Sequence, residues 1–159
     1  MRHFSVVNFL QPDTLLNPAA DAGGRTGTYR NVTGAHRVFI TYHITQGNAA
    51  TVALTPQQAK DTSGTSAKAI LTAKIYVNED TSLGSGNFVQ QTDAASYTTT
   101  ASTKNKIVVF ELDLPDALDL TNSFKTITAQ TGASNAANIT SAVVEMYGSY
   151  LGASGLGID

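Results

Sequence analysis

The chain has 159 residues, of which 42% are hydrophobic and only 14% are charged, against about 25% in an average soluble domain. This length suits one domain with its own core, and the hydrophobic fraction excludes a disordered chain. The net charge is −2 and the basic residues are scattered along the chain, which argues against nucleic-acid binding. The sequence has no cysteine, which excludes disulfides, thiolate catalysis and cysteine-ligated metals.

Residues 1–35 are predicted to form an arm that packs on the body or on a neighbouring molecule. Pro12, Pro18 and the Gly23-Gly24 pair interrupt this segment, and its apolar residues come in pairs without a regular period. The start of the chain lacks the apolar stretch of a secretory signal, and no window approaches the ~20 apolar residues of a membrane span. We therefore expect neither a signal peptide nor a membrane partner.

The body is predicted to begin at His36 with a strand. Apolar and polar residues alternate over His36–Thr45 with a period of two, and β-branched and aromatic residues dominate. A turn at Gln46-Gly47-Asn48 then predicts a hairpin with a second strand, Ala49–Thr55. Pro56–Lys60 is predicted to be a short helical turn, because proline is favoured at the first helical position.

Further short strands follow at the spacing that is typical of a sandwich or barrel. The most hydrophobic of them, Lys106–Leu112, is predicted to be central, and two Gln- and Thr-rich ones are predicted to lie at an edge or in a mostly solvated sheet. A bulge near Ser141 is expected in the last strand, because Ile139 is out of phase with the apolar residues after it. The remaining predicted strands are Lys68–Val77, Asn87–Thr92, Ser96–Ala101, Ser123–Thr131 and Asn138–Tyr150.

These elements predict an all-β, single-domain β-sandwich, jelly-roll-like, of about eight strands. The body spans residues 36–151 and carries one turn of helix at Pro115–Leu118, with Asp113 as its predicted cap. Residues 152–159 form a glycine-rich tail that contains Leu156 and Ile158. These two apolar side chains would be unusual on a purely solvated tail, and an assembly could order them.

The sequence shows no pattern of residues that favours catalysis or metal binding. His36 and His43 lie on one strand but point to opposite faces, so they cannot share a metal ion without help from elsewhere. The Asp113-Asp116-Asp119 series lacks the spacing and central glycine of a helix-loop-helix calcium loop. Neither a phosphate-binding loop nor a Gly-x-Ser-x-Gly motif occurs. We therefore expect no enzyme activity, cofactor, metal ion or small-molecule substrate.

Several stretches resemble a family of small head proteins of tailed bacteriophages, which look like capsid decoration, or cement, proteins. The resemblance covers the chain from about Asn17 to Val144. It consists of short stretches of similar sequence and does not include a catalytic motif. It rests on Asn17–Thr28 (NPAADAGGRTGT), Ile44–Ala59 (ITQGNAATVALTPQQA), Gln91–Ala94, Lys104–Leu112 and Thr131–Val143 (TGASNAANITSAV). The resemblance implies a jelly-roll or sandwich body and supplies no active-site residues.

The resemblance and the charge-poor composition together predict a structural virion protein. It would be made in the host cytoplasm and would bind the outer surface of the phage head, with the major capsid protein and further copies of itself, as a dimer or trimer, as partners. The alternative is a tail or head-fibre module that adheres to host glycans, and a hydrolase with an unrecognised site ranks third. The candidate partner contacts are Phe4, Phe9, Leu10, Leu15, Leu16, Arg25, Tyr29, Leu156 and Ile158.

Overall fold

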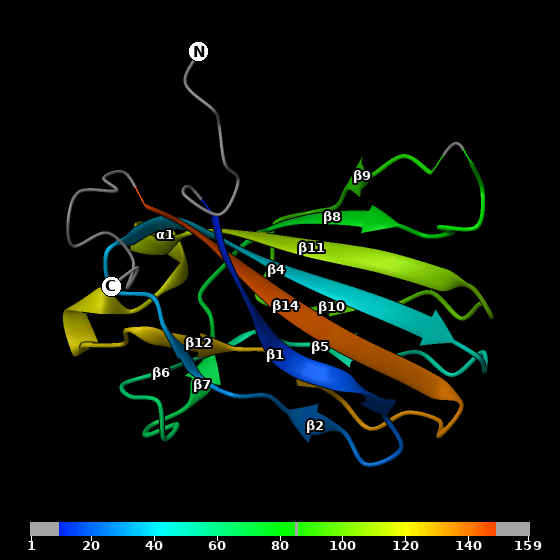
Figure 1. The fold of residues 1–159 in the computed structure, drawn as a ribbon, viewed down its shortest axis with the longest axis horizontal. Coiled ribbons are helices and arrows are strands. Elements are labelled where there is room, and N and C mark those ends of the chain that lie inside the picture. Colours follow the sequence, from blue (N-terminus) through cyan, green and yellow to red (C-terminus); the bar gives the residue numbers. More distant parts are fainter. Residues whose placement is uncertain (1–9, 85, 149–159) are drawn as a thin grey trace.

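The computed structural model describes residues 10–84 and 86–148, which fold into two layers of antiparallel strands (Figure 1). The larger layer is a six-stranded sheet in the order β1-β14-β4-β11-β8-β9. Its long strands cross the short strands of the second layer. The six strands are β1 (Leu10–Ala20), β4 (Ala35–Gln46), β8 (Lys74–Asn78), β9 (Val89–Gln90), β11 (Asn105–Asp113) and β14 (Asn138–Gly148).

The second layer is made of two four-stranded groups, ordered β10-β5-β13-β2 and β3-β12-β6-β7. Each of the stretches 25–31, 53–59 and 126–131 contributes one strand to each group. The two groups are thus the halves of one kinked layer, and the bond from Thr55 N to Gln130 O continues the pairing across the kink. The strands are β2 (Arg25–Thr26), β3 (Arg30–Asn31), β5 (Ala53–Leu54), β6 (Gln57–Ala59), β7 (Lys68–Ala69), β10 (Tyr97–Thr98), β12 (Thr126–Thr128) and β13 (Gln130–Thr131).

The order in which the chain visits the two layers is that of a jelly roll. β1, β4, β11 and β14 lie side by side in the larger sheet as β1-β14-β4-β11. The stretches β2–β3, β5–β6, β10 and β12–β13, which alternate with them along the chain, make up the facing layer together with β7. β8 and β9 are an insertion that widens the larger sheet. The predicted jelly-roll-like sandwich is therefore confirmed.

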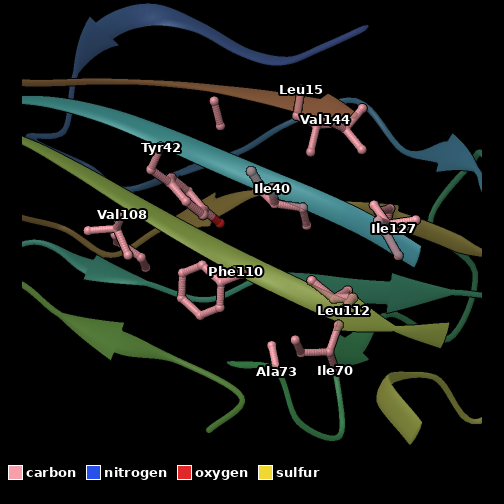
Figure 2. Packing of buried hydrophobic residues seen from close by; sticks show 14 of the residues in the cluster. Leu15, Ile40, Tyr42, Ile70, Ala73, Val108, Phe110, Leu112, Ile127 and Val144 are labelled. Carbon is pink, nitrogen blue, oxygen red and sulfur yellow. The ribbon is translucent and has the colours of Figure 1, made fainter. Parts of the chain in front are cut away.

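The core lies between the layers, and β4 and β11 supply its centre. Along both strands every second residue is buried, which is the period of two that the sequence shows. The Tyr42 and Phe110 rings meet edge to face at 5.6 Å between centroids. Figure 2 shows these side chains beside β4 and β11, together with Ile127 of the facing layer and other buried residues. The prediction that Lys106–Leu112 is a central strand is confirmed.

The predicted hairpin between His36–Thr45 and Ala49–Thr55 is wrong. β4 pairs with β11 and β14, whereas β5 lies in the other layer and pairs with β10 and β13. The connection crosses between the layers because polar side chains hold it open. The Asn138 side chain accepts a hydrogen bond from Asn48 N and donates one to Ala50 O, and both distances are 2.8 Å.

Two further predictions fail where one stretch of chain belongs to the second layer. Pro56–Lys60 contains the strand β6 rather than a helical turn, because β12 pairs with it on one side and β7 on the other. The predicted strand Lys68–Val77 is two strands in different layers, β7 and β8. The chain passes from one layer to the other between Ala69 and Lys74.

The structure places no bulge in β14 near Ser141. Burial alternates without interruption from Asn138 to Gly148, with Asn138 and Thr140 facing inward and Ile139 exposed. The irregularities lie instead in β1, between Thr14 and Ala19, and at the end of β14 where it pairs with β4. Polar residues take inward positions here because partners inside the fold satisfy them.

The predicted helical turn exists as α1 (Leu114–Ala117), and η2, a 3-10 turn, follows at Leu120–Asn122. Asp113 occupies the N-cap position of α1 but its side chain makes no capping hydrogen bond. The capping carboxylate is Asp119, which accepts from Asn122 N at the start of η2.

Candidate interaction surfaces

The predicted N-terminal arm is not separate from the body over the residues that the structure describes. Residues 10–20 form β1, an edge strand of the larger sheet, and residues 25–31 belong to the second layer. Leu15 and Leu16 are 3% and 5% exposed and belong to the core, which corrects their prediction as outward contacts. Leu10 is half-buried at the start of β1. Phe4, Phe9, Leu156 and Ile158 lie outside the described residues.

Arg25 binds groups of its own chain. Its guanidinium contacts Asp21 Oδ1 at 2.9 Å, Asn17 O at 2.9 Å and Thr140 O at 2.6 Å. Asp21 is completely buried and also accepts hydrogen bonds from the hydroxyls of Thr131 and Thr140. We call these side chains, Asp21, Arg25, Thr131 and Thr140, the Asp21 cluster. The cluster joins the β1–β2 turn to both layers.

The outer edge of β1 is covered by the segment that follows it. Thr28 N donates to Leu15 O at 3.0 Å, and Arg30 reaches Thr14 O at 3.4 Å and the Asp13 carboxylate at 2.9 Å. An edge strand whose carbonyl groups are satisfied in this way is a poor template for adding a strand from another chain. β1 is therefore unsuited to partner binding by strand addition.

Tyr29 is half-buried and packs on the loop after β6. Gly64 approaches its ring so closely that a Cβ there would lie 2.8 Å from Tyr29 Cε2, and the φ of Gly64 is +81°. The contact fixes one face of the ring inside the chain. A partner contact through the other face stays a prediction.

Carboxylates gather in a small pocket at the end of β11. Asp93, Glu111, Asp113 and Asp116 line it together with Lys74, and its volume is about 80 Å³. Arg37 lies 3.2 Å from Glu111, so part of the negative charge is compensated. This volume is far below the ~300 Å³ at which ligand sites begin. Within residues 10–84 and 86–148, no three His, Asp or Glu residues are placed to hold a metal ion.

A larger hollow, which we call the apolar groove, lies beside α1. Its volume is about 560 Å³, within the range of ligand and peptide sites. The buried side chains of Val32, Leu114 and Phe124 contribute to its lining, and Leu120, 49% exposed, stands beside them. The other lining residues are Thr33, Gly34, Ala35, His36, Pro115, Ser123 and Lys125.

The groove has a positively charged flank. Lys68 Nζ lies 4.3 Å from the centre of the Phe124 ring and Lys60 Nζ lies 5.7 Å from it, both within cation–π range. Lys68 also pairs with Asp119 at 2.6 Å. Together with Lys125 on the lining, these ammonium groups favour an occupant that is apolar or negatively charged.

A second set of exposed apolar side chains lies near the other end of β11, on the segment that leads into β9. We call Leu83, Phe88 and Val89 the β9 apolar patch; they are 57%, 49% and 60% exposed. Thr81 N donates to Asn105 O at 2.9 Å, which anchors the segment to the start of β11. Gly86 packs on the Asn78 side chain, where a Cβ would lie 2.5 Å from Nδ2. No local sequence pattern predicts this patch, because the neighbouring Phe88 and Val89 could equally face the core.

A buried lysine stabilises the loop beside this patch. Lys106 Nζ donates to Thr100 O and Thr100 Oγ1, each at 2.7 Å, and lies 3.2 Å from Glu79. Burial raises the pKa of Glu79, but hydrogen bonds from Thr100, Tyr97 and Lys106 outweigh it and hold the pKa below its ordinary value. Burial and the bond to Glu79 raise the pKa of Tyr97 to about 12. This arrangement is structural, since every member is satisfied by another.

No helix within the described residues has the length and apolar character needed to cross a membrane.

No protein-family model matches the sequence. No curated protein matches it either. Among solved structures, the chain is similar to the crystal structure of the SPBc2 prophage-derived protein YomS, at a TM-score of 0.47 and 9% sequence identity. The match covers 86% of this chain and 92% of that one. The name of that protein states its origin in a prophage and does not state an activity.

Proposed function

We propose that this chain is a structural virion protein that decorates the head of a tailed bacteriophage. In this role it binds the outer surface of the shell and stabilises contacts between capsomers of the major capsid protein. The sequence resemblance over Asn17–Val144 suggests the role. One structural observation supports it. The apolar groove and the β9 apolar patch leave apolar side chains exposed near opposite ends of β11.

The separation of the two surfaces suits a protein that bridges neighbours. β11 has nine residues, so its ends lie about 27–30 Å apart at ~3.4 Å per residue. The apolar groove begins at Leu114, directly after the strand, and the β9 apolar patch is anchored at Asn105, its first residue. Figure 1 shows α1 and the β8–β9 connection at opposite ends of the molecule. Such a body can contact two capsomers at once.

The low charge of the chain suits repeated contacts of modest strength. Neutral hydroxyl and amide groups cost less to desolvate than charged groups do. A contact of standard size buries about 800 Å² on each partner. Many such contacts on one shell reinforce each other, because each bound copy raises the effective concentration of the next contact.

The proposal is tested by binding the purified chain to phage heads assembled without it. We expect saturable binding, density for the chain on the outer surface in electron micrographs, and heads that withstand heating better. Replacing Leu83, Phe88 and Val89 together by serine should weaken binding at least tenfold. Leu71→Ser is the matched control, because Leu71 is 53% exposed but belongs to neither surface. Density confined to the tail would contradict the proposal.

Self-association is a separate part of the proposal. Sedimentation of the purified chain over a range of concentrations should show a dimer or trimer. The triple serine variant of the β9 apolar patch should then sediment as a smaller species if that patch joins copies. A wild-type chain that remains monomeric at every concentration would contradict self-association in solution, and leave the shell as the only site of assembly.

Adhesion to host glycans is the second candidate, and the exposed aromatic ring of Phe88 favours it. Jelly rolls occur in lectin domains as well as in viral capsids, so the fold does not separate the two roles. Binding to a glycan array that Phe88→Ala abolishes would favour adhesion. Shell binding without glycan binding would favour decoration.

A further inference from the structure

The apolar groove has two walls that the backbone already holds together. Its lining comes from residues 32–36 on one side and residues 114–125 on the other. Val32 N donates to Lys125 O at 3.0 Å, which joins the two walls. At the rim, Gly34 has a φ of +87°, and a Cβ built there would meet no atom within 4 Å among the described residues. An occupant therefore meets an open groove whose backbone needs no ordering, which lowers the free-energy cost of binding.

Two lysines at the groove form no ion pair in the part of the chain that the structure describes. Lys125 lines the groove, and Lys60 lies over the ring of Phe124. Asp61 is near enough to Lys125 to be affected by it: hydrogen bonds from Thr65 and, to a smaller extent, the charge of Lys125 lower the pKa of Asp61 below its ordinary value. The Asp61 carboxylate also accepts from Thr65 N at 3.1 Å, so it is bonded within its own loop. The groove thus combines an apolar lining with positive charge at its border.

We propose that the groove binds an acidic segment of a partner protein that carries large apolar side chains. The apolar side chains fill the hollow of about 560 Å³ and cover Leu120, which is half exposed. Asp or Glu residues beside them meet the ammonium groups of Lys60 and Lys125. The inference rests on the proposed function in that the partner is taken to be the surface of the shell, and it deepens that function by naming the chemistry of the segment bound.

Other occupants fit the groove less well. A second copy could offer its β9 apolar patch, but Phe88 and Val89 are flanked by Asn87 and Gln90, which bring no negative charge. A nucleic acid would pair with the lysines, but the net charge of −2 on the chain opposes it. An acidic and apolar protein segment satisfies both the lining and the lysines.

The proposal is tested by fluorescence anisotropy with labelled peptides and the purified full chain. The probe peptide has Phe-Leu at its centre and Glu-Asp on both sides. We expect saturable binding that weakens as salt is added, because salt screens exposed charges. Replacing the centre by Ser-Ser, or the flanks by Lys-Arg, should each weaken binding about tenfold. Equal binding of all three peptides, or binding of none, would overturn the proposal.

Two substitutions with matched controls locate the binding in the groove. Leu120→Ser should weaken binding of the probe peptide about fivefold. Leu71→Ser, the control, changes a similarly exposed leucine outside the lining and should leave binding unchanged. Lys125→Gln should weaken binding about threefold and reduce its salt dependence, whereas Lys74→Gln, at an exposed lysine of β8, should change neither. Circular dichroism confirms that each variant is folded, and equal losses in a variant and its control would overturn the proposal.

Failure of the inference and failure of the proposed function give different results. Binding of the probe peptide without binding to phage heads would contradict decoration but support the preference of the groove. Binding to heads that Leu120→Ser and Lys125→Gln both leave unchanged would overturn the inference alone. A wild-type oligomer that Leu120→Ser dissociates would show that a second copy fills the groove, and would overturn the inference. Tighter binding of a single-stranded oligonucleotide than of the probe peptide would overturn it as well.

Discussion

The two layers of the sandwich are stabilised by different kinds of interaction. In the larger sheet, β4, β11 and β14 are long, pair over nine or more residues and present apolar side chains to the core. In the second layer the strands are two or three residues long, and inward-facing polar side chains bond to the backbone of neighbouring segments. Backbone ladders and apolar contacts hold the first layer, whereas side-chain hydrogen bonds complete the second.

The difference shows why a layer of such short strands can exist. A two-residue strand makes too few backbone hydrogen bonds to hold its own position. Gln58 and Thr126 supply the missing bonds, because their side chains bind Ala69 O, Ala59 O and Asp61 O. The second layer is therefore expected to be more sensitive to loss of a polar group than the first layer is.

The largest effect is expected in the apolar centre of the larger sheet. Phe110→Ala removes a fully buried ring that packs on Tyr42, and should lower the free energy of unfolding by about 3–5 kcal/mol. Phe88→Ala, the control, removes an exposed ring and should cost less than about 1 kcal/mol. Urea unfolding followed by circular dichroism measures both. Similar losses for the two variants would contradict the placement of the core.

The Asp21 cluster is a polar junction between the layers. Asp21→Ala leaves Thr131 and Thr140 without their acceptor and Arg25 without its counter-charge, and should cost about 3 kcal/mol. Asp13→Ala, the control, removes a partly exposed pair with Arg30 and should cost at most about 1 kcal/mol. Urea unfolding at neutral pH compares them. Equal costs would mean that burial of the cluster adds nothing.

A smaller effect is expected for a single amide in the second layer. Gln58 is fully buried; it donates to Ala69 O and accepts from Asp119 N. Gln58→Leu keeps the volume but leaves both groups unpaired, and should cost about 2 kcal/mol. Gln57→Leu next to it removes one half-buried bond to Gln130 and should cost about half as much. A neutral or stabilising Gln58→Leu would show that this layer does not depend on side-chain hydrogen bonds.

The smallest effect concerns the pH dependence of the loop beside the β9 apolar patch. The pKa of Glu79 is lower in the folded chain than its ordinary value, so Glu79 stabilises the fold above that ordinary value. This contribution is lost as the pH falls through the lower, folded pKa. Glu79→Gln should therefore flatten the decline of unfolding free energy between neutral and acid pH. Acid titrations that superimpose for variant and wild type would contradict a shifted Glu79.

Local sequence patterns suffice to predict the class of the fold and its central strands. Alternation of apolar residues over His36–Thr45 and Lys106–Leu112 reflects burial of one face against the core, and that pattern is local. The low charge and the absence of cysteine likewise limited the kinds of site from composition alone.

The second layer and the surfaces depend on long-range contacts that exist only in the folded chain. Asp21 and Thr140 are 119 residues apart, so no local pattern predicts that each satisfies the other inside the fold. The same long-range bonds allow Thr140 to face inward while Ile139 faces solvent, which reverses what hydrophobicity predicts. The groove arises in the same way, because its lining comes from residues 32–36 and 114–125, which meet only in the folded chain. Period and composition report burial against the core, but they do not report which distant segment supplies a partner.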